Sequence, residues 1–128
     1  MAVERSLAIL RVEDLPAVRE ASWFRQGCAR ATAGTDGDQW AAGRKEQVRT
    51  CALHVLACSA AAYRVSGWRI ACRRLAAGER ARADAMRALY ELHRAGVVPA
   101  RLFDRVAIAS AELRGALAAL AMEIRERR

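Results

Sequence analysis

Apolar residues recur every three or four positions along most of the chain, which is the spacing of one face of an α-helix. The pattern is most regular between about 99 and 126, where the apolar positions are Leu102, Val106, Ala109, Leu113, Leu117, Leu120 and Ile124. Stretches 15–33, 39–65 and 80–95 show similar spacing. Alternation of apolar and polar residues, which indicates a β-strand, is rare. The pattern therefore predicts an all-α protein.

Glycine, proline and polar clusters mark the expected helix ends. Asp14 before Leu15-Pro16 predicts one helix start, and Asp38, at the end of the loop 34–38, predicts another. The connection 96–99 precedes the last helix. Ser66-Gly67 predicts a break and Gly78 is a second weak point, so the number of helices stays open between four and five.

These signals predict a single helical domain over residues 1–128, folded as an antiparallel bundle of four or five helices. In the first helix we expect Val18, Cys28 and either Trp23 or Phe24 to face the core. Several other core positions are alanine, which lets helices approach closely but buries little apolar area. Such a bundle can complete its core by oligomerising or by docking onto a partner. The structure of residues 1–14, with the apolar patch at 7–10, is left open.

Composition supports the same fold class, because alanine, leucine, arginine and glutamate are strong helix formers and dominate the sequence. The N-terminus shows no basic leader followed by an apolar run, so we expect a cytoplasmic protein. The longest apolar run, 51–63, is too short to cross a bilayer, and we expect no membrane contact. The four cysteines lack C-x-x-C spacing, which favours reduced core residues.

Positive charge is concentrated in the middle of the chain. Residues 39–96 carry eleven basic and four acidic side chains, whereas residues 1–38 carry five and six. On a continuous helix, Arg69, Arg73 and Arg80 fall within about 40° of one another. Guanidinium groups pair with phosphate oxygens, so we expect this part of the chain to bind nucleic acid. The candidate residues are Arg44, Lys45, Arg49, Arg64, Arg69, Arg73, Arg74, Arg80 and Arg82.

We find no motif for base readout, so contact with the phosphate backbone of RNA or single-stranded DNA is the favoured interpretation. The alternative is an ordinary solvated helix surface. Trp23, Trp40 and Trp68 could stack on unpaired bases, but packing is the simpler role for them.

Metal and catalytic interpretations are weaker. Cys51, His54 and Cys58 share one helix face, and Cys72 or Cys28 could add a fourth ligand, but this spacing fits no standard zinc site. Burial explains these residues better, so no metal or cofactor is expected. Neither histidine has a catalytic partner nearby in sequence, and we expect no enzymatic activity.

In size, helicity and charge the whole chain resembles the helical small subunits of CRISPR effector ribonucleoprotein complexes, although no specific motif carries the likeness. The resemblance implies a non-catalytic subunit present in several copies. Large subunits of the complex would be its neighbours, and Arg69, Arg73 and Arg80 would face nucleic acid.

Two alternatives explain the same features. The chain is also similar to the basic four-helix accessory protein of diversity-generating retroelements, which implies a ring that binds nucleic acid. A protein-interaction module, such as an adaptor, an antitoxin or a phage inhibitor, would instead use its arginines to bind an acidic protein.

Overall fold

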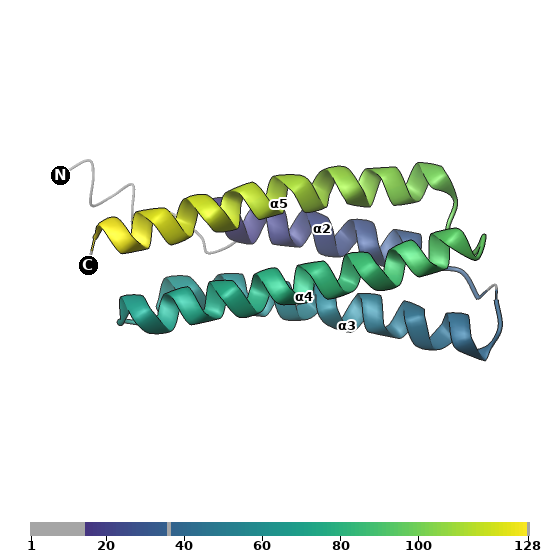
Figure 1. Cartoon of the computed structure of the whole chain (residues 1–128), viewed down its shortest axis with the longest axis horizontal. Helices are drawn as coiled ribbons and strands as arrows, with labels where there is room; N and C mark the ends of the chain where they lie inside the picture. Colours follow the sequence, from purple (N-terminus) through teal and green to yellow (C-terminus); the bar gives the residue numbers. More distant parts are fainter. Residues whose placement is uncertain (1–14, 36, 128) are drawn as a thin grey trace.

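The computed structural model describes residues 15–35 and 37–127, which form four α-helices and no strand. The helices are α2 (Pro16–Ala31), α3 (Gln39–Arg64), α4 (Trp68–Arg94) and α5 (Ala100–Glu126). Each runs antiparallel to the next along the chain (Figure 1). The predicted all-α bundle is thus confirmed. The Asp14 start signal and the apolar patch at 7–10 lie outside the described residues.

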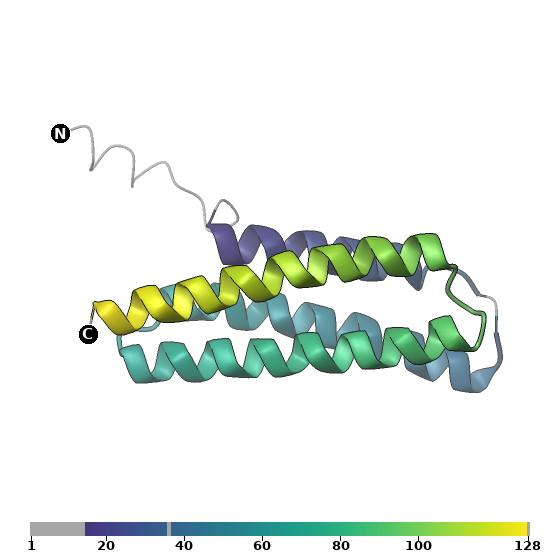
Figure 2. The same ribbon diagram turned by 45° about the horizontal axis from the view of Figure 1, so that its top comes forward.

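The helices form a square in cross-section. α3 packs closely against α4, α2 against α5, and two further contacts, α2 with α3 and α4 with α5, close the bundle. α2 is therefore diagonally opposite α4 (Figure 2). α2 has 16 residues and the other three helices have 26 or 27, so α2 covers only part of the length of its neighbours.

The core combines a few large side chains with many alanines. Phe24, Leu89, Leu92 and Leu113 are fully buried. Of the two aromatic residues left open for the first helix, Phe24 faces the core, and Trp23 is 54% exposed. Because alanine is small, the helices approach one another closely along much of their length.

Gly78 does not break its helix, and α4 runs through it without interruption. The reason lies in the packing against α3. A Cβ added at Gly78 would lie 3.3 Å from the Cβ of Cys58, so the missing side chain lets α3 and α4 come together. Among the described residues there are consequently four helices, and the break expected at Ser66-Gly67 separates α3 from α4.

The helix ends follow the predicted chemistry. Asp38 caps α3, its Oδ1 accepting a hydrogen bond from the backbone N–H of Ala41 over 3.0 Å. Gly96 ends the turn after α4 with φ +79°, a conformation that favours glycine. Near this corner, His93 stacks on Phe103 of α5, with ring centroids 4.8 Å apart.

Candidate nucleic-acid interface

One face of α4 carries a line of exposed arginines over nearly its whole length. Because the helix is continuous, its geometry of about 100° and 1.5 Å per residue applies from end to end. Five arginines then fall within about 60° of one another and span about 37 Å. We call this set the arginine ridge; it consists of Arg69, Arg73, Arg80, Arg87 and Arg94, all exposed.

Sequence reasoning found only part of this ridge. The dense run of arginines considered in the sequence ends at Arg82, so Arg87 and Arg94 were missed. A signal for both was present: Arg73, Arg80, Arg87 and Arg94 are each seven residues apart, which is close to two helical turns.

Most of the ridge is not neutralised. Arg73, Arg80 and Arg94 make no ion pair within the part of the chain that the structure describes. Nη1 of Arg87 lies 3.6 Å from Oδ1 of Asp84, and the two side chains are 72% and 40% exposed. The guanidinium of Arg69 lies 5.2 Å from the ring centre of Trp68, which leaves its charge available. The ridge therefore presents several cations to solvent.

Arg64 and Arg74 are exposed but lie off the ridge. Arg74 is turned by about 100° from Arg73, toward the α3 side of α4. Burial raises the pKa of the Cys58 thiol on α3, and the nearby Arg74 charge partly offsets this rise. Arg64 is in the last turn of α3, where a cation interacts favourably with the helix dipole.

Arg82, expected to bind nucleic acid, instead joins α4 to α5. Its side chain is only 12% exposed. The guanidinium donates hydrogen bonds to both carboxylate oxygens of Glu79, over 2.6 and 2.8 Å, and to Oγ of Ser110 over 2.7 Å. The hydrogen bond with Arg82 lowers the pKa of Glu79 and, reciprocally, raises the pKa of Arg82. Arg82 is thus engaged between α4 and α5, where three of its N–H groups donate these bonds.

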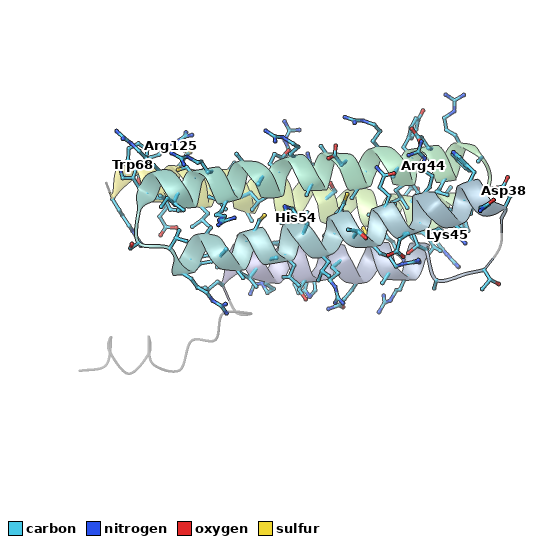
Figure 3. The ribbon with its side chains drawn as sticks, turned by 90° about the horizontal axis from the view of Figure 1, so that it is seen from below. Asp38, Arg44, Lys45, His54, Trp68 and Arg125 are labelled. Carbon is cyan, nitrogen blue, oxygen red and sulfur yellow. The ribbon has the colours of Figure 1, made fainter. Side chains whose placement is uncertain are left out.

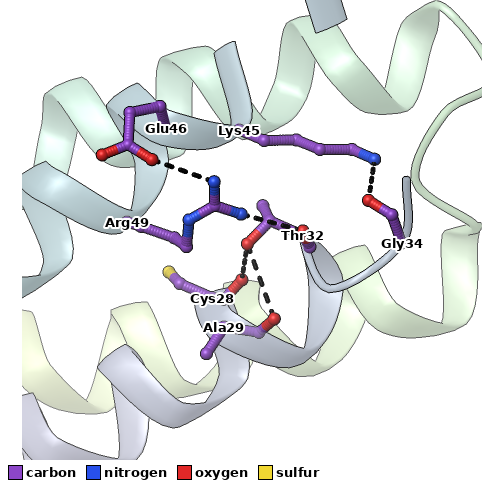
Figure 4. A network of polar contacts seen from close by, with 7 residues as sticks. All are labelled: Cys28, Ala29, Thr32, Gly34, Lys45, Glu46 and Arg49. Carbon is purple, nitrogen blue, oxygen red and sulfur yellow. Dashed lines mark hydrogen bonds and ion pairs between the residues drawn. The ribbon is translucent and has the colours of Figure 1, made fainter. Parts of the chain in front are cut away.

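Lys45, which was also expected to bind nucleic acid, is buried. It is 6% exposed, and its Nζ donates a hydrogen bond to the backbone oxygen of Gly34 over 2.6 Å. Arg49 lies beside it, and its Nη1 donates to the backbone oxygen of Thr32 over 3.0 Å (Figure 4). Two cations of α3 thus hold the chain that leaves α2, where a helix exposes unpaired carbonyl groups.

Arg44 is likewise engaged within the bundle. Its Nε lies 2.9 Å from Oε2 of Glu91 on α4, and its guanidinium lies 5.8 Å from the ring centre of Trp40. Figure 3 shows Arg44 and Lys45 near the Asp38 end of α3, with Trp68 at the opposite end of the bundle. All three residues expected to widen the ridge therefore make intramolecular contacts. Lys45 is buried, whereas the side chains of Arg44 and Arg49 are 37% and 42% exposed.

The cysteines and histidines form no ligand cluster in the described residues. His54 is exposed, whereas Cys58 is buried against α4. Burial raises the pKa of the Cys28 thiol to about 12, with a smaller contribution from Cys51. Cys28 is thus a protonated core residue at neutral pH.

No protein family model matches the chain, and neither do any curated proteins or solved structures. None of the described helices is long and apolar enough to cross a membrane.

Proposed function

We propose that this protein is a non-catalytic subunit that binds the phosphate backbone of RNA or single-stranded DNA through the arginine ridge of α4. The observation that supports this function best is the regular spacing of exposed arginines on one straight helix. Larger subunits of a nucleic-acid-containing assembly, of the kind formed by CRISPR effectors, would hold the protein in place.

The dimensions of the ridge suit a stacked single strand. Its length of about 37 Å corresponds to roughly eleven stacked nucleotides at about 3.4 Å each. Arginine is well suited to phosphate, since its planar fork of donors can bind two oxygens of one phosphate at once. A line of such groups along a rigid helix contacts the backbone and needs no particular base sequence.

Charge reversal on the ridge tests the proposal. Arg73, Arg80 and Arg94 make no ion pair in the described chain, so changing all three to glutamate breaks no described salt bridge. We expect the affinity for a fluorescent mixed-sequence oligonucleotide to fall at least about tenfold at low salt, measured by fluorescence anisotropy. RNA and single-stranded DNA of the same sequence are tested in parallel.

A matched control is available on the opposite side of the bundle. Arg19, Arg25 and Arg30 are exposed on α2, and changing them to glutamate alters the net charge by the same amount. We expect this variant to keep most of the affinity. An equal loss in both variants would mean that overall charge, and not the ridge, drives binding.

A wild-type protein that binds neither oligonucleotide would contradict the proposal altogether. A pulldown from the native host, split into nuclease-treated and untreated halves, then identifies the partner. Recovery of nucleic acid with a fixed set of large subunits supports the ribonucleoprotein role. One acidic protein recovered without nucleic acid would favour the interaction-module alternative.

A further inference from the structure

The solvent-facing side of α5 carries two large exposed apolar side chains, with mostly small residues and the charged Glu112 and Arg114 between them. Ile108 and Met122 are 65% and 61% exposed, the two highest values among the exposed large apolar side chains of the described residues. Between them, Ala111, Gly115 and Ala118 are exposed and, together with Ser110 and Arg114, line a shallow hollow of about 520 Å³ beside Arg82 of α4. Ile108 and Met122 lie about 21 Å apart along the helix, one beyond each end of this hollow, and each could bury its apolar side chain against a partner.

This surface is symmetric about Gly115. Ile108 lies seven residues before Gly115 and Met122 seven residues after it, so each is about two helical turns away on the same side of the helix. A Cβ added at Gly115 would meet nothing within 4 Å, which shows that the middle of the face is open. A second α5 placed antiparallel would bring Ile108 opposite Met122 of the second copy, with the two glycines at the point of closest approach.

The charged residues near the two ends of α5 are also complementary in this antiparallel arrangement. A two-fold axis through the contact brings the same flank of both helices together, with their directions reversed. Arg105 lies ten residues before Gly115, and Glu126 lies eleven after it on that flank. Asp104 lies eleven before Gly115, and Arg125 lies ten after it toward the other flank. In this arrangement Arg105 would lie opposite Glu126 of the second copy and Asp104 opposite Arg125 of the second copy, and each pair would occur twice.

From this self-complementarity of shape and charge we infer that α5 forms an antiparallel two-fold contact with α5 of a second copy of this chain. The occupant of the face is thus the protein itself. The contact leaves the arginine ridge of α4 free, so the dimer does not depend on nucleic-acid binding. Failure of either proposal leaves the other standing.

The first test measures molar mass by light scattering coupled to gel filtration. The chain mass is 14.0 kDa, and we expect wild-type protein to approach twice this value as its concentration rises from about 1 to 100 µM, a range suited to a modest interface. The Gly115→Glu variant should remain a monomer, because a charged side chain then occupies the closest point of contact. A wild-type protein that stays monomeric across this range would overturn the inference.

Gly43 of α3 provides a matched control, since it is also an exposed helical glycine with nothing within 4 Å of an added Cβ. The Gly43→Glu variant carries the same change of charge and should dimerise like the wild type. Equal loss of dimer in both variants, or a dimer that persists in Gly115→Glu, would exclude the α5 face.

Disulfide cross-linking tests the two-fold geometry, because a disulfide requires Cα atoms within about 7 Å. Under mild oxidation the Gly115→Cys variant should form a covalent dimer on a non-reducing gel, and Gly43→Cys should not. Ile108→Cys alone should form none, whereas an equimolar mixture of Ile108→Cys and Met122→Cys should. Efficient self-linking of Ile108→Cys would indicate a parallel contact and overturn the antiparallel arrangement.

Discussion

At the scale of single residues, two glycines have opposite effects on the stability of the fold. Gly37 has φ +105°, and a Cβ built there would lie 2.6 Å from the Cβ of Ala41. Gly43 lies in the exposed part of α3, where an added Cβ meets nothing within 4 Å. The first glycine is required by the turn before α3, and the second lowers the stability of the helix.

We therefore expect Gly37→Ala to lower the free energy of unfolding by at least about 1–2 kcal/mol, because alanine is strained at this φ and collides with Ala41. Gly43→Ala should raise the free energy of unfolding by about 0.5–1 kcal/mol, the usual difference in helix propensity. Urea denaturation followed by circular dichroism measures both values. A Gly37→Ala variant as stable as the wild type would show that the turn relaxes without cost.

The identity of a residue alone did not decide which arginine and lysine side chains are exposed to a binding partner. Lys45 and Arg82 look like surface residues in a basic sequence, yet one holds the backbone at Gly34 and the other bridges Glu79 and Ser110. Gly34 lies 11 positions from Lys45 and Ser110 lies 28 positions from Arg82, whereas Glu79 is only three positions from Arg82. The two contacts between elements depend on how the helices pack, and short-range sequence patterns do not contain them.

At the scale of elements, the charged carboxylate of Glu79 contributes to the packing of α4 against α5. Glu79 of α4 binds Arg82 on its own helix and lies 4.0 Å from Arg114 of α5. Hydrogen bonding to Arg82 and the nearby positive charges outweigh burial and lower the pKa of Glu79 below its ordinary value of 4.5. The charged form of Glu79 thus contributes to stability.

This shift predicts a specific pH dependence. Because the pKa is lower in the folded state, the stabilisation is fully present above pH 4.5 and is lost as pH falls through the folded-state pKa. We expect Glu79→Gln to be less stable than the wild type at pH 7, with the difference shrinking below pH 4.5. Urea denaturation from pH 3 to 7 measures it.

Glu112→Gln is a suitable comparison for that experiment, because Glu112 is exposed on α5 and makes no ion pair among the described residues. We expect its effect on stability at pH 7 to be smaller. A difference between Glu79→Gln and wild type that stays constant down to pH 3 would contradict the role of the charged carboxylate.

At the scale of the whole molecule, the arrangement of the bundle separates two surfaces. The exposed face of α4 carries the arginine ridge, whereas the exposed face of α5 carries Ile108 and Met122 on either side of Gly115. A single bundle therefore offers one face suited to a polyanion and another suited to a second copy of itself.

The salt dependence of binding reports how many ridge residues contact phosphate. If all five do, the logarithm of the affinity for a single strand should fall with the logarithm of salt concentration with a slope of about 3.5. Replacing Arg80 and Arg87 with alanine should reduce this slope by about 1.4. Alanine at Arg25 and Arg30 of α2 should leave the slope unchanged. Anisotropy titrations from low to moderate salt measure the slope for the wild type and both variants. A slope that is equal in all three would place the phosphate contacts elsewhere.

The sequence by itself determined the all-α class, the capping of α3 by Asp38, the break near Ser66-Gly67 and the concentration of positive charge in the middle of the chain. These features depend on helix periodicity, turn chemistry and charge counts, which are local properties. The interpretation of Gly78 depended on packing, since the space that it leaves is filled by Cys58 of another helix. A continuous α4 in turn brought Arg87 and Arg94 into line with the ridge.

Only the tertiary structure decided which cations are available to a partner and which hold the bundle together. It buried Lys45 and engaged Arg44, Arg49 and Arg82 with groups on other elements. The physical reason is the same in each case: the environment of a side chain is set by neighbouring helices, and those neighbours are distant in sequence.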